Sequence, residues 1–407
     1  GEDFAAWNDF YADTATLARA LFDGVTDPLV TRSEAREHVA SVSGSDEIWN
    51  RFIEEPIGHD IADRFTHDVV RGVVLTDGLI GTFAPNMDSE LEANRCFLYH
   101  VIGGGTGDWD VPVGGMGAVS GALTEAARLA GAQLVANAEV LEITQNNTVR
   151  YEKDGVEHSI TARYVLANSS PRELARLTGG HSISIPGEGA QVKVNMVLSR
   201  LPKLLDPQVT PEQAFGGTFH INETWSQLDK AYTSAEGGSI PSPLPCEIYC
   251  HSLTDPSILG EELQQSGAHT LTVFGLHTPH RLTEKYDPDE LRALLEAEVL
   301  ASLNSVLAEP IEDLLLRDAH GKPCIETKTT HDLEEALRLP GGNIFHGPLS
   351  WPFAEDTDDL STPAQRWGVD SGIGRIVLCG SGARRGGAVS GIAGHNAAMA
   401  VLEMEAQ

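Results

Sequence analysis

The chain has 407 residues, enough for two domains that each bury an apolar core. Its 28 lysines and arginines are outnumbered by 59 aspartates and glutamates, which gives a formal net charge of −31. Such a surface repels phosphate backbones and anionic lipid headgroups, so we expect no nucleic acid among the partners of this protein.

The cysteine content bears on the cellular compartment. Five cysteines are few and odd in number for so long a chain. This argues against a disulfide framework and predicts a reducing, cytoplasmic location. The sequence also lacks an apolar run of about 18 residues, so we expect no transmembrane segment.

The first quarter of the chain is predicted to be mainly helical. Phe4, Trp7 and Leu17 recur at helical spacing and predict an amphipathic helix at the very start. Because a natural chain rarely begins with glycine inside an element, we expect the reading frame to continue upstream. Further helices with capping residues are predicted within 33–40 and 46–65.

Two glycine clusters follow in the stretch YHVIGGGTGDWDVPVGGMG, residues 99–117. A dinucleotide fingerprint needs a strand, G-x-G-x-x-G and a helix that begins within it, because the pyrophosphate meets free N–H groups there. After Gly103 and Gly105, Asp108 stands where the third glycine belongs, and Pro112 comes too late to start a helix. We interpret this first cluster as a turn-rich loop.

The second cluster, 114–117, leads into a helix that is predicted over 120–130 and ends at Gly131. Glycines also occur where a helix packs closely on a strand, so this pattern alone leaves the role of the cluster open. A strand is predicted next, over 132–143. Asp154-Gly155 then predicts a hairpin between two short strands.

The middle of the chain predicts a mixed, partly antiparallel sheet. Its strands are expected over 191–199, 246–253 and 269–277. A helix is predicted over 287–307, with Pro288 in its first turn.

Two side-chain pairs in this region have the proximity of metal ligands. Cys246 and Cys250 lie beside His251, but no second ligand pair accompanies them, so we interpret them as buried thiols. His277 and His280 lie in a proline-containing loop without neighbouring acids or thiols. We therefore predict no metal site.

The C-terminal stretch, RIVLCGSGARRGGAVSGIAGHNAAMAVLEM, predicts a buried strand, a glycine-rich loop and a helix of small residues. The loop contains Gly380, Gly382, Gly386, Gly387, Gly391 and Gly394. So many glycines let a backbone lie against a flat ligand, and a helix N-terminus aimed at a reduced flavin would stabilise its negative charge. The alternative is a tight loop around a buried helix.

The sequence resembles the phytoene-desaturase-like FAD-dependent oxidoreductases, in particular the branch of pyridine nucleotide-disulphide oxidoreductase domain-containing proteins. The matching segments lie at 76–84, 111–134, 192–202, 341–351 and 377–398. The resemblance implies a mixed α/β fold with a discontinuous Rossmann-like FAD-binding domain and a substrate domain built on a mixed sheet and helices.

The resemblance also implies a division of the chain and a missing part. The substrate domain would comprise 1–108 and 180–364, and the remainder of the FAD-binding domain would comprise 109–179 and 365–407. Members of the family open with a strand, G-x-G-x-x-G and a helix that hold the FAD pyrophosphate. This chain shows no such βαβ segment, so we expect an N-terminal truncation, which leaves open whether this chain alone binds FAD or is active.

The cofactor contacts implied by the resemblance are distributed along the chain. Val140 would contact the adenine side, Ala167 and Asn168 would lie near the pyrophosphate or ribose, and the helix after the second cluster would start in the flavin domain. The implied cofactor-binding residues are Gly114, Gly115, Met116, Val140, Ala167, Asn168, Gly380, Ser381, Gly382, Gly391, Ile392 and Ala393. Ser381 departs from the acid common in wider relatives, and Arg384-Arg385 replaces the usual His-Pro.

If FAD binds, the expected reaction moves a hydride from a C–H bond of a hydrophobic or amine-type small molecule to the flavin. His346 is the candidate catalytic residue, for contact with the ring or for proton handling, and a structural hydrogen-bonding role is the alternative. The alternative hypothesis for the whole chain is a non-catalytic protein that keeps the fold and binds a protein partner. A flavin-free NAD(P)-dependent reductase would need its own fingerprint, which we do not find. The substrate, the electron acceptor and the oligomeric state are left open.

Overall fold

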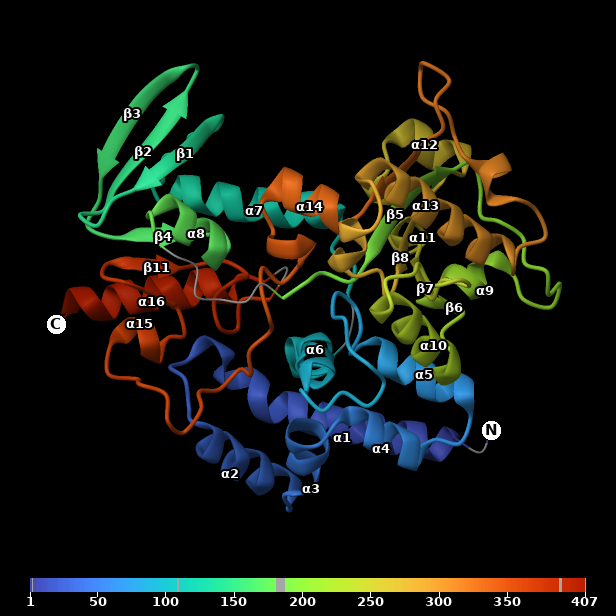
Figure 1. The fold of residues 1–407 in the computed structure, drawn as a ribbon, viewed down its shortest axis with the longest axis horizontal. Coiled ribbons are helices and arrows are strands. Elements are labelled where there is room, and N and C mark those ends of the chain that lie inside the picture. Colours follow the sequence, from blue (N-terminus) through green and yellow to red (C-terminus); the bar gives the residue numbers. More distant parts are fainter. Residues whose placement is uncertain (2, 108–109, 181–186, 388–389, 407) are drawn as a thin grey trace.

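A computed structural model describes residues 1, 3–107, 110–180, 187–387 and 390–406. It shows a mixed α/β fold in which a helical layer lies below two lobes that each contain strands (Figure 1). Asp108, which the fingerprint argument invoked, lies outside the described residues. The part of the chain that the structure describes contains no helix that is both long and apolar enough to cross a membrane.

The N-terminal helices form the lower layer, with α6 above α1 at its centre (Figure 1). They are α1 (Phe4–Phe22), α2 (Arg32–Ser43), α3 (Glu47–Trp49), α4 (Ile57–Arg64), α5 (Asp68–Thr76) and α6 (Glu92–Val101). The predicted helix at the start of the chain is confirmed as α1, which buries Phe10 and Leu17. Helix α2 begins at a capping box in which Thr31 and Glu34 accept each other's backbone N–H groups.

The helical character predicted within 46–65 is confirmed, but the stretch is interrupted. Helix α3 runs into a π-helical turn, Asn50–Glu54, and α4 begins only after Pro56. Glu55 is extended, with φ −116° and ψ 149°. Proline disfavours the helical conformation of the residue before it, which explains the break.

A five-stranded antiparallel sheet forms the core of the right-hand lobe (Figure 1). Its strands are β6 (Phe219–Ile221), β7 (Cys246–Tyr249), β8 (His269–Gly275), β5 (Val192–Leu198) and β9 (Ile325–Lys328), in this spatial order. The surrounding helices are α9 (Pro211–Phe215), α10 (Trp225–Glu236), α11 (His251–Thr254), α12 (Glu261–Ser266), α13 (Pro288–Asn304) and α14 (Thr330–Leu337). Helix α13, which begins with Pro288 as predicted, packs its buried leucines into the core beneath β5 and β8.

The left-hand lobe contains two three-stranded sheets (Figure 1). The first is β1 (Ala138–Ile143), β2 (Thr148–Lys153) and β3 (Val156–Thr161), and the second is β10 (Asp370–Ile373), β11 (Ile376–Leu378) and β4 (Val165–Ala167). Its helices are α7 (Gly115–Leu129), α8 (Pro171–Leu177), α15 (Pro363–Arg366) and α16 (Ile392–Ala406). Strands β4 and β11 pair in parallel, although more than half of the chain separates them in sequence.

Two strand predictions are too long. The predicted strand over 132–143 begins only at Ala138, after Asn137 with φ +52°, because its partner β2 ends opposite Ala138 and no other described strand pairs with the residues before it. The predicted strand over 246–253 ends at Tyr249, where α11 begins after Cys250. Helix α7, in contrast, begins at Gly115, five residues before its predicted start at Ser120.

Other local predictions are confirmed. Asp154 and Gly155 both have positive φ, 54° and 74°, and join β2 to β3 as the hairpin signal requires. Gly131 ends α7 with φ +89°. The first glycine cluster is not preceded by a strand, because it follows the end of α6 and forms a short 3-10 turn at Gly103–Gly105.

Three separate apolar cores underlie these parts. The first joins α1, α4, α5 and α6, the second lies under the five-stranded sheet, and the third joins β4, β11, α8 and α16. The buried members of the third core lie in 143–177 and 364–400. The division into a substrate domain and an FAD-binding domain nevertheless remains a prediction.

Candidate functional site

A cavity of about 850 Å³ lies where the three parts meet. The C-terminal end of α6, the segment 344–352 and the glycine-rich loop 381–387 supply most of its wall. Volumes of this size are typical of sites for small molecules and cofactors.

Most of the wall is apolar. Ile80, Leu98, Phe274 and Ile344 line it together with Phe345. Removing water from such a surface favours a flat or hydrophobic ligand, because about 25 cal/mol is gained for each Å² of apolar surface that is buried.

Aromatic side chains at the end of α6 form one side of the cavity. The ring of Tyr99 lies 5.1 Å from the rings of both His100 and Phe345, in edge-to-face arrangements. Burial lowers the pKa of His100 to about 4, so its imidazole is neutral near pH 7. Sequence analysis missed Tyr99 and His100 because the apolar spacing indicates that they lie on a helix but not which distant segment its face meets.

The glycines of the C-terminal loop differ in whether packing within the protein requires them. A Cβ at Gly380 would lie 1.9 Å from Asn168 Oδ1, and one at Gly382 would lie 2.4 Å from Pro171 Cδ. These glycines are therefore required by contact between the loop and the turn after β4. A Cβ at Gly391 would meet none of the described atoms within 4 Å.

Five of the site residues proposed from sequence line the cavity, namely Met116, His346, Ser381, Gly382 and Ile392. The others lie outside the lining. Val140 lies on β1, Ala167 ends β4, Asn168 faces Gly380, and Gly391 and Ala393 lie beside Ile392 at the start of α16.

Gly114 and Gly115 precede and begin α7, where sequence analysis expected a flavin-domain helix start. The N–H of Gly114 donates a hydrogen bond of 2.7 Å to Asp255 Oδ2, and Gly115 lies near Ile258. This helix N-terminus thus already has a carboxylate from the other lobe, as the helix dipole favours.

His346 enters the cavity wall from a left-handed backbone conformation, with φ +65°. Its Nδ1 is buried and has no hydrogen-bond partner among the described residues. Burial lowers the pKa of the ring below its usual value, which keeps the imidazole neutral. A neutral ring with a nitrogen that lacks a partner is able to accept a proton or to orient a ligand.

Arg385 brings a positive charge to the same wall. Its guanidinium donates to the carbonyls of Gly24, Asp27 and Trp367. Burial lowers its pKa to about 10, so it stays charged at neutral pH. It lines the same cavity as Ser381 and Gly382, where a cation favours a negatively charged ligand group.

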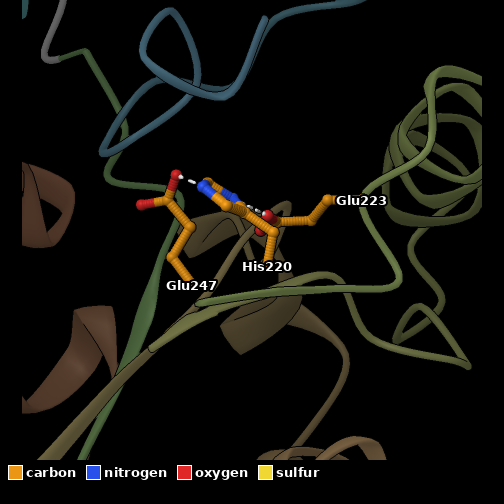
Figure 2. A group of neighbouring side chains, drawn as sticks. All are labelled: His220, Glu223 and Glu247. Atoms are coloured by element: carbon orange, nitrogen blue, oxygen red, sulfur yellow. Dashed lines mark hydrogen bonds and ion pairs between the residues drawn. The ribbon is translucent and has the colours of Figure 1, made fainter. Parts of the chain in front are cut away.

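A second, smaller cavity of about 320 Å³ is polar, and it shares Tyr249 with the large one. His220 and Glu247 line this smaller cavity. Figure 2 shows these two side chains together with Glu223, a group that we call the acidic cluster, in which Glu223 and Glu247 approach the ring of His220 from opposite sides. His220 Nδ1 lies 2.5 Å from Glu223 Oε2 and 3.8 Å from Glu247 Oε1. Asp77, at the end of α5, lines the same cavity.

Burial governs the electrostatics of the acidic cluster. It raises the pKa of Asp77 to about 6 and, together with repulsion from Glu223, that of Glu247 to about 8. The pKa of Glu223 is also raised, by burial first and by Asp77 second. The hydroxyl of Tyr249 donates a hydrogen bond of 2.8 Å to Glu247 Oε2 and so links the acidic cluster to the wall between the two cavities.

The residue pairs weighed as metal ligands from sequence do not belong to the group of three donors that the described residues bring together. Cys246 and Cys250 are buried thiols whose pKa burial raises. His280 instead contacts Glu334 and Thr330. His277 packs edge-on against Phe83 and Tyr232.

His277 makes the stability of the protein depend on pH. It is fully buried, neither ring nitrogen has a partner among the described residues, and burial lowers its pKa to about 3. Below about pH 6.5 this histidine binds a proton in the unfolded chain but not in the folded protein. The free energy of unfolding therefore decreases as the pH is lowered. Between pH 7.5 and 5.5 this histidine alone is expected to cost about 1.4 kcal/mol.

The variant His277→Asn should remove this contribution of one proton to the slope of the free energy of unfolding against pH. The short asparagine side chain tolerates the left-handed φ of +55° at this position. Urea unfolding at both pH values measures it. The exposed His320→Asn is the matched control and should leave the slope unchanged. Equal slopes for wild type and His277→Asn would contradict the prediction.

Comparison with known proteins places this site in a family context. No family model matches the chain. It is 56% identical to the uncharacterized protein Rv0897c of Mycobacterium tuberculosis over 97% of this chain and 74% of that protein. It is 31% identical to pyridine nucleotide-disulfide oxidoreductase domain-containing protein 2 of Mus musculus over 85% of this chain and 60% of the mouse protein.

A solved structure shares the fold. A variant of putrescine oxidase from a structure-based redesign of cofactor binding superposes with a TM-score of 0.51 at 14% identity, over 100% of this chain and 76% of that one. With 56% identity across nearly its whole length, the chain belongs to the family of the mycobacterial protein Rv0897c.

Proposed function

We propose that this protein is an FAD-dependent oxidoreductase that takes a hydride from a C–H bond of a hydrophobic or amine-type small molecule. The observation that carries the proposal is the convergence of Met116, His346, Ser381 and Ile392 from distant segments on one largely apolar cavity. The name of the mouse relative and the shared fold with putrescine oxidase support redox chemistry. The low cysteine content supports a cytoplasmic location.

The residues present fit a flavin. Gly391 adjoins the lining residue Ile392, and a Cβ there would meet none of the described atoms, so a flat ring could approach the start of α16. Arg385 offers a charge for a phosphate or a reduced ring. Bound FAD would supply the hydride acceptor.

The chain's own residues would bind and orient the substrate. The apolar wall of Leu98, Phe274 and Phe345 would bind its hydrocarbon part and exclude water. His346, neutral and with Nδ1 free of described partners, would take the proton of a substrate N–H or O–H group at that atom.

We propose further that a phosphate-binding strand and helix complete this domain. Helix α7 has no buried residue, and its face with Met116, Val119 and Leu123 is open, Leu123 being 63% exposed. Strand β4 is an edge strand of its sheet. An apolar helix face and an open strand edge are the surfaces that a βαβ unit would cover, and the mycobacterial relative is longer than the matched region.

The test compares this chain with the product of the complete reading frame. Each is mixed with excess FAD and desalted, and the visible absorption spectrum is recorded. We expect the longer protein to retain the yellow flavin band, and a band in this chain as well would show that no further segment is needed. If neither retains flavin, the oxidoreductase proposal is wrong.

The open face of α7 also favours a second candidate function, a non-catalytic protein that binds a protein partner there. Absence of flavin from both proteins in the same experiment would favour it. Flavin that stays bound to either protein in the absence of a partner would exclude this second function.

Gly391→Val is expected to reduce FAD retention at least about tenfold with little change in melting temperature, because the new side chain would stand next to the lining residue Ile392 and would meet none of the described protein atoms. The control is Gly217→Val, another position where a Cβ meets nothing within 4 Å, whose chain neighbours, unlike Ile392 beside Gly391, do not line the large cavity. The measurement is bound flavin per protein after desalting. Equal retention by both variants would remove Gly391 from the flavin site.

A further inference from the structure

The acidic cluster of His220, Glu223 and Glu247 has no part in the proposed hydride transfer. Its three donor atoms, the His220 ring nitrogen and one carboxylate oxygen of each glutamate, all lie within 4.8 Å of one another. Donors that share one transition-metal ion at about 2.0–2.2 Å lie up to roughly 4.4 Å apart. Small side-chain rotations would therefore bring all three to a single ion.

The backbone holds these donors in place. His220 on β6 and Glu247 on β7 are directly opposite each other in the antiparallel pair, so their side chains lie on the same face. Asn222, with φ +60°, then turns the chain so that Glu223 reaches back to His220 (Figure 2). Its side-chain amide donates to Leu244 and Ser302, which fixes this turn.

One atom of the acidic cluster lacks a partner. The Glu223 side chain is only 1% exposed, and its Oε1 has no hydrogen-bond partner among the described residues. A buried carboxylate oxygen that is left without a donor is costly, and native proteins satisfy such atoms with protein groups, water or an ion.

The charges around the acidic cluster favour a cation. Asp77 faces the same cavity as His220 and Glu247 and adds a third carboxylate. Within the described residues, no lysine or arginine lies within ion-pair distance of Asp77, Glu223 or Glu247. Buried carboxylates are usually paired with cations or coordinate metals, and here the described residues supply one imidazole, that of His220.

We propose that His220, Glu223 and Glu247 bind a divalent first-row transition-metal ion, with Asp77 as a further oxygen ligand or an outer partner. One imidazole with carboxylates suits Zn²⁺ or Mn²⁺ better than Mg²⁺ or Ca²⁺, which favour oxygen ligands throughout. The ion would join β6, β7 and the end of α5 and, through the hydrogen bond from Tyr249 to Glu247, would hold the wall that the two cavities share.

The test uses the untagged chain after treatment with chelator and desalting, without flavin, so its result does not depend on the flavin proposal. Zn²⁺ binding is measured by calorimetry and Mn²⁺ binding by electron paramagnetic resonance. We expect one ion per chain and a rise in melting temperature at saturating metal, because an ion that binds only the folded state stabilises it. No binding at millimolar metal would overturn the proposal.

Glu223→Gln keeps the shape of the side chain and removes its charge. It should lower metal affinity at least about tenfold and abolish the metal-dependent rise in melting temperature. Glu334→Gln is the matched control, because Glu334 pairs with His280 at 3.2 Å without belonging to a group of three donors. Unchanged affinity in Glu223→Gln would overturn the proposal.

Circular dichroism checks that each variant is folded. His220→Asn is measured as a second variant, so that the test still holds if Glu223→Gln does not fold. Loss of binding in a folded His220→Asn supports the site. Binding that survives in this variant as well would mean that the ion binds elsewhere, and it would overturn the proposal.

Discussion

Phe10→Ala is expected to lower the free energy of unfolding by about 3–5 kcal/mol. The Phe10 side chain is fully buried at the centre of the helical layer. Its ring lies within 6 Å of the rings of Tyr11, Phe52, Phe65 and Phe97. Truncation therefore removes the contacts of a whole ring and leaves a cavity between helices that cannot collapse independently.

The consequence reaches the large cavity, because Phe97 belongs to α6, which also carries Tyr99 and His100. Urea unfolding measures the loss. Phe4→Ala is the matched control on the same helix, because Phe4 is 68% exposed and its truncation should change stability by less than about 0.5 kcal/mol. Similar losses at both positions would show that Phe10 does not organise this core.

Gly72→Ala is expected to destabilise the protein by about 3 kcal/mol, although alanine is intrinsically the better helix former by about 1 kcal/mol. Gly72 lies in the interior of α5. A Cβ there would lie 1.9 Å from the carbonyl oxygen of Glu223 and 2.6 Å from the carbonyl carbon of Thr224. Both contacts are with backbone, so the helix has to move away from the segment that positions the acidic cluster.

Gly121→Ala is the control, and its expected effect on stability has the opposite sign. Gly121 lies in α7, and a Cβ there would meet nothing within 4 Å. Only the helix propensity then acts, and the substitution should stabilise the protein by about 0.5–1 kcal/mol. Urea unfolding of both variants measures the two effects, and stabilisation by Gly72→Ala would show that α5 does not contact Glu223 as closely as described.

Features that depend on neighbouring residues could be predicted from the sequence. The helix at Phe4–Phe22, the hairpin at Asp154-Gly155 and the helix that begins at Pro288 follow from apolar spacing, turn chemistry and helix capping. These signals act over a few residues and need no partner. The lengths of the strands were less predictable. The strand before Ile143 begins only where its partner β2 ends, and the strand from Cys246 stops at Tyr249, because α11 begins shortly after it although β8 continues.

The candidate site was predictable only in part, because it too depends on contacts between residues far apart in the sequence. Glycines 380 and 391 look alike in the sequence, yet one is required by contact with Asn168 and the other meets none of the described atoms. His100 and Phe345 were missed because the sequence does not show which face of α6 meets the segment after residue 343.

By itself, then, the sequence determined which segments form helices and hairpins, the acidic surface charge and the presence of a glycine-rich loop before the last helix, because each follows from local composition and spacing. Only the tertiary structure decided which residues share the large cavity, and that His220, Glu223 and Glu247 meet. Their meeting depends on the register of β6 with β7 and on the turn at Asn222, and strand register is set by long-range pairing that no short stretch of sequence encodes.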